Sequence, residues 1–144
     1  PAFLAAREAL RAMLDQEPGP GGTRGSLVLM TSVLALRPAP ALFATHAYAA
    51  AKAATIGLVR AMAAYYAEHA IRVNALAPAL VRTPMSARAA ADPASVAFAE
   101  GHQPLSGGFL DPADVTAAAV YLCSDDSRAV TGQVLTVDGG WTVT

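Results

Sequence analysis

The chain has 144 residues, of which 54% are hydrophobic, and its 10 basic and 11 acidic side chains give a formal net charge of -1. It therefore lacks the basic stripe that nucleic acids and anionic membranes require, and neither is expected as a partner. One cysteine excludes an internal disulfide, no set of Cys and His has metal-site spacing, and no apolar run reaches the roughly 18 residues of a membrane span. We expect one domain over residues 1–144, without a metal, in the cytoplasm.

A helix, a loop and a strand are predicted first along the chain. Apolar residues at near-helical spacing predict a helix over residues 2–15. Proline and glycine make residues 17–25 a loop. The continuous apolar run over residues 26–32 is typical of a strand buried on both faces.

The middle of the chain repeats this order with a longer helix. Residues 46–69 form the longest predicted helix, and residues 71–77 form a second strand that Pro78 ends. Residues 81–109 are rich in Pro, Gly and Ala and have weak periodicity, which predicts a loop that carries short helices.

The last helix and strand follow a clear start signal. In the run Asp111-Pro-Ala-Asp114, an aspartate N-cap, a proline at the first helical position and a carboxylate at the third begin a helix over residues 111–123. Cys123 at its end is expected to be buried. A turn follows, and residues 133–138 form a third strand.

This alternation of helices and strands predicts the fold class. It produces parallel strands joined by right-handed crossovers, and hence an α/β fold with a doubly wound, three-layer, Rossmann-like sheet. Ligands in such folds bind at the carboxyl ends of the strands, where the strand order reverses. Three strands are few, so we expect the half of the sheet that supplies this reversal to lie outside these residues.

Tyr48 and Lys52 are the strongest candidates for chemistry. A spacing of four places both side chains on one face of a helix. Lys52 is the only lysine, and it lies in an apolar stretch where an ammonium without a role would be costly. A phenol titrates near pH ~10 and moves protons poorly at neutral pH unless a cation stabilises its phenolate. Tyr48 is thus a candidate general acid/base, the alternative being a surface tyrosine that packs on the lysine stem.

Ser32 is the third candidate. It lies at the carboxyl end of the first predicted strand, the side of a doubly wound sheet that faces the ligand crevice. Its hydroxyl would hold a substrate oxygen beside Tyr48. The alternative is a serine that merely begins a turn.

Five segments, in this order, resemble the short-chain dehydrogenases/reductases: Leu29-Met-Thr-Ser32, Tyr48-Ala-Ala-Ala-Lys52, and residues 72–83, 111–115 and 131–141. The resemblance covers essentially the whole chain. It implies that Tyr48 is the general acid/base, that Lys52 assists it and binds the nicotinamide ribose, and that Ser32 orients the substrate oxygen.

The resemblance also implies a nicotinamide cofactor, NAD or NADP. The loop that begins with Pro78 would border the nicotinamide, with the Val81 backbone and the Thr83 hydroxyl at the carboxamide. The family usually has glycine where this chain has Ala79, so we expect an altered backbone there. The turn Asp138-Gly-Gly would be architectural.

Other features of the family are missing from these residues. Its opening strand and glycine-rich pyrophosphate turn have no counterpart here, so we expect the chain to be the carboxyl-terminal portion of a longer enzyme. The catalytic asparagine of the family would fall before Pro1. Asn74 lies within the second predicted strand and is not that residue.

The predicted helix over residues 46–69 has few polar positions and must be covered on both sides, by the sheet and by a partner subunit. The resemblance points to a homo-oligomer, a dimer or tetramer, built through this helix and residues 2–15. His46, His69 and His102 are expected at the surface or in loops. Trp141 is expected to serve packing or a subunit contact.

The leading hypothesis is an NAD(P)-dependent oxidoreductase that interconverts a small secondary alcohol and a ketone by hydride transfer. Two alternatives remain. One is a non-catalytic binding or regulatory protein on the same fold, and the other is an inactive fragment that lacks the pyrophosphate site. The sequence neither identifies the substrate nor chooses between NAD and NADP.

Overall fold

A computed structural model describes residues 2–40, 42–43 and 45–144. Its centre is a sheet of three parallel strands in the order β1-β2-β3, with the bounds Gly25–Met30, Ile71–Pro78 and Val134–Val137. Gly25 pairs with Ile71 at one end of β1 and Met30 with Leu76 at the other. The predicted parallel α/β sheet is confirmed, and within the described residues its strand order does not reverse.

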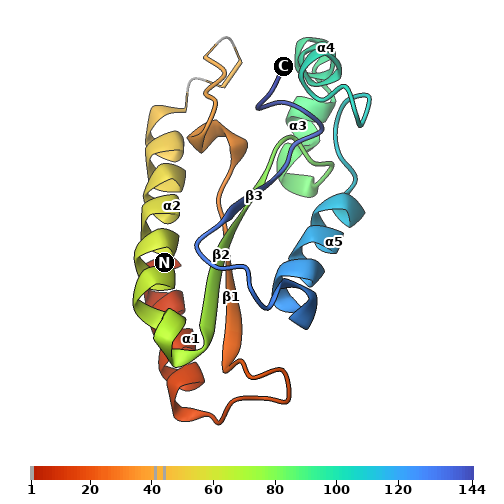
Figure 1. Ribbon diagram of the computed structural model, residues 1–144. Coiled ribbons are helices and arrows are strands. Elements are labelled where there is room, and N and C mark those ends of the chain that lie inside the picture. The colour runs from red at the N-terminus through yellow and green to blue at the C-terminus, as the bar shows by residue number, and fades with distance from the viewer. Residues whose placement is uncertain (1, 41, 44) are drawn as a thin grey trace.

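Helices cover the sheet on both faces, which gives three layers (Figure 1). Helices α1 (Ala2–Asp15) and α2 (His46–Tyr66) lie against one face, and α5 (Pro112–Cys123) lies against the other. The core between the first two helices and the sheet consists of buried apolar side chains: Ala6, Leu10, Val59, Met62, Ala63, Ile71, Val73 and Ala75. Burial of these apolar surfaces is what holds α1 and α2 on the sheet.

The first strand is less buried than predicted, and it ends at Met30 instead of at residue 32. The central strand β2 is buried from Ile71 to Ala77, whereas β1 is only half-buried and Met30 is exposed. The expectation of a strand buried on both faces over residues 26–32 is therefore wrong. Within the described residues β1 pairs with β2 alone, so its outer edge is not covered by a neighbouring strand.

The long helix is also shorter than predicted. Helix α2 ends at Tyr66, and the last three residues of the predicted range, 67–69, form a 3₁₀ turn. The next residue, Ala70, has a φ of 57°, in the left-handed region that terminates helices. This single turn of the backbone directs the chain into β2.

Helix α5 begins as the sequence predicts. The Asp111 carboxylate accepts a hydrogen bond from the Ala113 N–H (2.8 Å), and the Asp114 carboxylate accepts one from the Asp111 N–H (3.0 Å). The prediction of a buried Cys123 is wrong, because Leu122 takes the position that faces the sheet and leaves the cysteine exposed.

The segment over residues 81–109 carries two helices, α3 (Ala87–Ala90) and α4 (Pro93–His102). Helix α4 has 10 residues, and its start is fixed by the Asp92 N-cap and by Pro93 at its first position. Both helices gather with the chain's C-terminus at the carboxyl ends of the strands (Figure 1).

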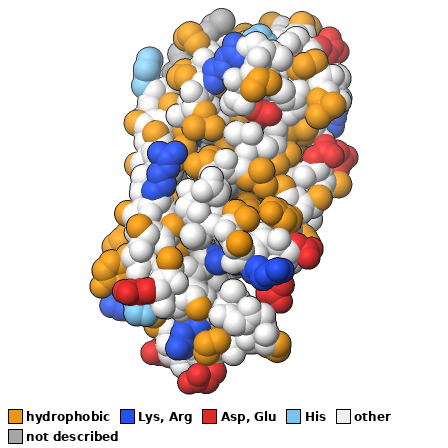
Figure 2. Space-filling view, viewed as in Figure 1, with side chains coloured by type: hydrophobic (Ala, Val, Ile, Leu, Met, Phe, Trp, Pro, Cys, Tyr) orange, Lys and Arg blue, Asp and Glu red, His pale blue; other side chains and the backbone are white. Residues whose placement is uncertain are grey.

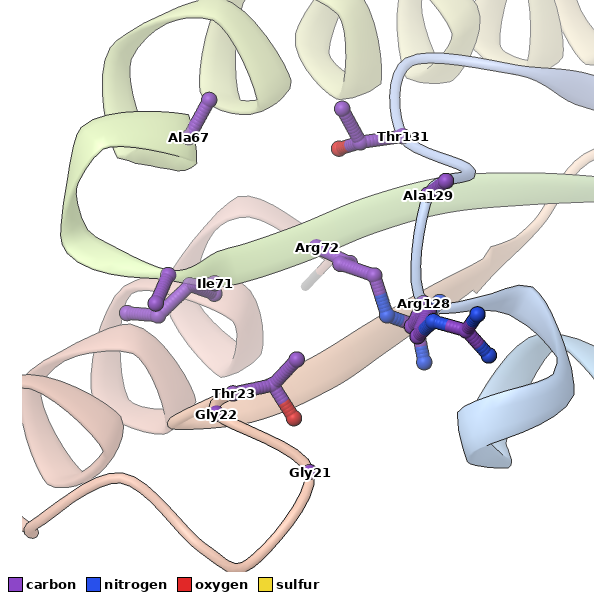
Figure 3. A pocket seen from close by; sticks show the side chains of 10 residues that line it. Gly21, Gly22, Thr23, Ala67, Ile71, Arg72, Arg128, Ala129 and Thr131 are labelled. Atoms are coloured by element: carbon purple, nitrogen blue, oxygen red, sulfur yellow. The ribbon is translucent and has the colours of Figure 1, made fainter.

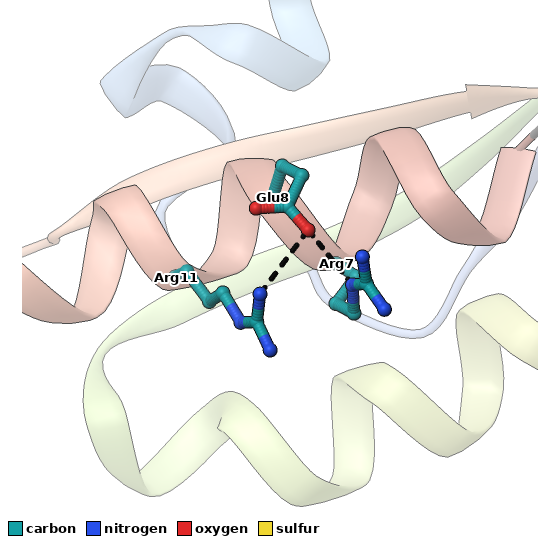
Figure 4. Close-up of polar contacts among 3 residues, drawn as sticks. All are labelled: Arg7, Glu8 and Arg11. Carbon is teal, nitrogen blue, oxygen red and sulfur yellow. Dashed lines mark hydrogen bonds and ion pairs between the residues drawn. The ribbon is translucent and has the colours of Figure 1, made fainter.

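Charges on the surface are mostly isolated. On α1, the Glu8 carboxylate lies between Arg7 (2.8 Å) and Arg11 (3.3 Å), all three exposed (Figure 4). Figure 2 shows charged side chains scattered over one face, with hydrophobic ones gathered between β3 and α5.

Among the described residues, none of the helices combines the length and apolar character that crossing a bilayer requires. That part of the chain also holds no group of three or more His, Cys, Asp or Glu placed to bind a metal ion.

Candidate active site

Ser32 lies two residues beyond the end of β1, where it caps a 3₁₀ turn over residues 33–35. Its side chain is buried, and its hydroxyl oxygen accepts a hydrogen bond from the Leu34 N–H (3.2 Å). The serine therefore does begin a turn. Its hydroxyl proton has no acceptor among the described residues and remains available for a substrate oxygen.

Lys52 is fixed to the same end of β1. Its Nζ donates to the Met30 carbonyl (2.9 Å), and its own carbonyl accepts a hydrogen bond from the Thr31 hydroxyl (2.8 Å). These two hydrogen bonds hold α2, at Lys52, against Met30 and Thr31, the two residues that precede Ser32. The sequence does not predict this hydrogen bond of Thr31, because it joins two residues that are 21 positions apart in the chain.

Tyr48 faces Lys52 as the spacing of four predicts. The Lys52 Nζ lies 5.6 Å from the centre of the Tyr48 ring, within the range of a cation–π interaction. Tyr48 is 44% exposed, so the residue is accessible from solvent. Tyr48, Lys52 and the end of β1, which is followed by Ser32, therefore lie on the same side of the fold.

The loop after β2 continues the sheet before it turns away. The Ala79 N–H donates to the Val137 carbonyl (3.1 Å), which extends the pairing of β2 with β3. Ala70 is the only described non-glycine residue with a positive φ, so Ala79 has an ordinary backbone and the methyl group causes no strain there. The expectation of an altered backbone at this alanine is therefore not supported.

Beyond Ala79 the loop presents polar groups. The Val81 N–H donates no hydrogen bond to any described residue, whereas the Val81 carbonyl accepts one from the Ser86 hydroxyl. Thr83 caps the next 3₁₀ turn, and its hydroxyl oxygen accepts from the Ser86 N–H (3.3 Å). A free backbone N–H and a hydroxyl two residues later are groups that a planar amide could bind.

An aromatic cluster lies beside this loop: Phe43, Phe98, His102 and Trp141. Trp141 is buried, as expected for a packing role. His102 was expected at the surface or in a loop, but it ends α4 and stacks on Phe98 with ring centres 3.8 Å apart. Its Nδ1 lies 2.9 Å from the Phe98 carbonyl. His46 and His69 are exposed, as expected.

The turn after β3 has the architectural role expected of it. Gly139 and Gly140 have φ values of 59° and 104°, which a residue with a side chain rarely adopts. The Asp138 carboxylate accepts hydrogen bonds from the Gly140 N–H (3.0 Å) and from the N–H (3.0 Å) and hydroxyl (2.6 Å) of Thr142. Burial opposes ionisation of Asp138, but these hydrogen bonds outweigh it and hold the pKa of this carboxyl below its usual value.

A cavity of about 310 Å³ lies at the opposite, amino-terminal side of the strands (Figure 3). Arg72, at the start of β2, is one of its lining residues, and its guanidinium donates to the Leu122 (2.9 Å) and Ser124 (3.0 Å) carbonyls. These acceptors lie at the carboxyl end of α5, whose dipole favours a cation. Arg72 thus fastens α5 to the sheet, far from Tyr48. The buried Asn74 is likewise structural, because its amide bonds the Val130 carbonyl and the Gln133 N–H.

Comparison with known proteins identifies the family. A family model described as enoyl-(acyl carrier protein) reductase matches residues 2–142. The 2,5-dichloro-2,5-cyclohexadiene-1,4-diol dehydrogenase of Sphingobium indicum is 40% identical over 142 residues, which are 97% of this chain and 53% of the relative. The chain spans about half the length of the curated relatives it matches.

Solved structures show the same fold. A gluconate 5-dehydrogenase from Burkholderia cenocepacia in complex with NADP and tartrate has a TM-score of 0.86 and 30% identity, over 99% of this chain and 52% of that one. A 4-hydroxyisoleucine dehydrogenase complexed with NADH has a TM-score of 0.83 and 32% identity, over 99% of this chain and 55% of that one. Together with the ordered motifs, these matches establish that the chain belongs to the short-chain dehydrogenase/reductase family.

Proposed function

We propose that these residues are the carboxyl-terminal, catalytic portion of an NAD(P)-dependent oxidoreductase that interconverts a secondary alcohol and a ketone. The observation that carries the proposal is the position of Lys52, whose Nζ donates to the Met30 carbonyl (2.9 Å) and lies 5.6 Å from the centre of the Tyr48 ring. An ammonium beside the ring would stabilise negative charge on the tyrosine oxygen, which a proton-transferring phenol needs.

In the proposed mechanism, each of the three residues has one task. In the oxidation direction, Tyr48 accepts the hydroxyl proton of the alcohol as its carbon loses a hydride, and in reduction it returns the proton to the carbonyl oxygen. Lys52 stabilises the phenolate. Ser32 donates a hydrogen bond to the substrate oxygen and holds it beside the tyrosine. The nicotinamide cofactor, when bound, accepts or supplies the hydride.

The loop residues fit a nicotinamide cofactor. Pro78 and Ala79 hold the start of the loop on the sheet, since the Ala79 N–H bonds the Val137 carbonyl. The unpaired Val81 N–H would donate to the carboxamide, and the Thr83 hydroxyl would contact the same group. Lys52 would use its remaining N–H donors, and Tyr48 its hydroxyl, toward the ribose. The NADP and NADH complexes of the two similar dehydrogenases support a cofactor of this class, either NAD or NADP.

The substrate we propose is a small alcohol or the matching carbonyl compound. The Sphingobium relative is named for a cyclohexadienediol, which carries secondary hydroxyl groups of the required kind. A single exposed cysteine suits a reducing compartment, so we also propose a cytoplasmic location.

We also propose that the protein forms a homo-oligomer, either a dimer or a tetramer. Exposed small residues recur on α2 at the spacing of one helical face: Ala50, Ala54, Gly57, Ala61 and Ala64. On the neighbouring α1, Phe3 and Leu4 are more than half exposed. A second copy that packs on these two helices would cover both surfaces.

Replacing Tyr48 with Phe in the full-length protein that contains these residues tests the catalytic role. We expect kcat to fall by about 10²- to 10⁴-fold, because the proton donor is lost while the ring and its contact with Lys52 remain. Steady-state kinetics with an accepted alcohol and titration with NADH or NADPH would measure turnover and cofactor binding separately.

Tyr65→Phe is the matched control for this experiment. Tyr65 lies on the same helix, is 68% exposed and contacts the Tyr66 ring, so loss of its hydroxyl should leave turnover unchanged. If Tyr48→Phe turned over substrate as fast as the wild type, the non-catalytic alternative would replace this proposal.

A further inference from the structure

Gln103 is a fully buried amide that binds the backbone of the proposed cofactor loop. It follows the last residue of α4 and is 0% exposed. Its Oε1 accepts a hydrogen bond from the Leu80 N–H (3.0 Å). Its Nε2 donates to the Leu80 carbonyl (3.1 Å) and to the Gly108 carbonyl (3.0 Å). The side chain thus pairs with Leu80 as a neighbouring strand would.

These contacts leave Leu80 little freedom. Its carbonyl also accepts a hydrogen bond from the Leu110 N–H (2.9 Å), and the Arg82 N–H donates to the Leu110 carbonyl (2.9 Å). The loop is therefore held on both sides of Val81. Among the backbone N–H groups of residues 79–83, that of Val81 is the one without an acceptor in the described part of the chain, so the loop is held on both sides of a free donor.

The packing around Gln103 keeps its side chain in this position. A methyl group placed on Gly139 would lie 3.0 Å from the Gln103 Cβ, and the Leu105 N–H bonds the Gly139 carbonyl (3.0 Å). The amide is therefore confined between the turn after β3 and the loop after β2. Because the amide is confined and hydrogen-bonded before a ligand binds, it already holds Leu80 in place. Ligand binding then costs little conformational entropy in this part of the loop.

We propose that Gln103 is a positioning residue for the cofactor: by fixing Leu80, it holds the adjacent Val81 N–H where the carboxamide of the nicotinamide binds. This inference rests on the proposed function. Arg82 and Thr83 on the far side of the loop are exposed, so without Gln103 the loop can move without unfolding the core.

The test replaces Gln103 with Met in the full-length protein that contains these residues. Methionine keeps the length and apolar volume of the side chain but removes both hydrogen-bonding groups. We expect the Kd and KM for NADH or NADPH to rise about tenfold, with kcat at saturating cofactor nearly unchanged. Isothermal titration calorimetry measures the Kd without turnover. An unchanged Kd would overturn the inference.

Asn74→Leu provides the matched control. Asn74 is a second fully buried amide with the same kind of backbone partners, but it lies in the middle of β2, away from the loop. We expect it to lower the denaturation midpoint while leaving the cofactor Kd unchanged. If both variants weakened cofactor binding equally, the effect of Gln103 would be one of general stability and the inference would fail.

Hydrogen exchange on the wild type gives a test that needs no variant. Without cofactor, the Leu80 amide should exchange slowly and the Val81 amide fast, and adding cofactor should slow exchange at Val81. Equal exchange at Val81 with and without bound cofactor would contradict the inference and the proposed carboxamide contact of Val81, while the bound cofactor would leave the proposed oxidoreductase function standing. A wild type that binds neither NAD(H) nor NADP(H) would instead overturn the proposed function and this inference with it.

Discussion

Asp138 shows how one side chain secures the end of a strand. Three hydrogen bonds from the turn converge on its carboxylate and are strongest when the group is ionised. The two glycines that follow have left-handed backbones and provide the space for this turn. Ser32 and Lys52 are likewise positioned by hydrogen bonds to backbone groups, at Leu34 and Met30.

The lowered pKa of Asp138 predicts a pH-dependent contribution to stability. A carboxyl whose pKa is lower in the folded than in the unfolded protein stabilises the fold above its unfolded pKa, about 3.9, and loses this contribution as the pH falls through the folded value. Asp138→Asn should therefore destabilise the protein at pH 7 and have a much smaller effect near pH 3. Urea unfolding at both pH values measures this, and a pH-independent difference would contradict it.

Helix α5 shows how local chemistry defines an element. Its start depends on four consecutive residues, in which two carboxylates and two backbone N–H groups satisfy one another. Its other end depends on tertiary contacts, since Arg72 binds the carbonyls of its last turn. The start could thus be predicted from sequence, whereas the exposure of Cys123 could not.

Removal of the cap should destabilise the protein measurably. We expect Asp111→Ala to lower the free energy of unfolding by about 1 kcal/mol, because the Ala113 N–H loses its acceptor. Urea denaturation of the full chain gives this value. Glu17→Ala, which removes an exposed carboxylate from a loop, is the control and should have little effect. Equal effects of the two changes would show that the cap contributes nothing.

At the scale of the whole molecule, two surfaces have no partner within the part of the chain that the structure describes. The strand β1 has an open edge among the described residues, and α2 presents its stripe of small side chains to solvent. Small residues allow two helices to approach closely, which favours helix packing between subunits over a solvated surface.

A charge placed on this stripe tests the proposed assembly. Ala61→Glu should shift the full chain from dimer or tetramer to monomer, because a carboxylate would be buried at the subunit contact without a partner. Analytical ultracentrifugation measures the change. Ala97→Glu, on an exposed position of α4, should leave the assembly intact. An oligomer that survives Ala61→Glu would place the interface elsewhere.

The sequence by itself determined the class of the fold, the start of α5 and the pairing of Tyr48 with Lys52. These features depend on spacing or on a few adjacent residues, so hydrophobic periodicity and capping chemistry are sufficient to predict them. The order of the motifs likewise indicates the family, and the family model that matches residues 2–142 confirms it.

Only the tertiary structure decided the half-burial of β1, the exposure of Cys123, the ordinary backbone of Ala79 and the contacts of Thr31 and Gln103. Each depends on what lies across the sheet or on the far side of a loop. Gln103, for example, meets Leu80 across 23 residues of chain. Such contacts arise from the packing of separate elements, and local sequence patterns contain no record of which elements will meet.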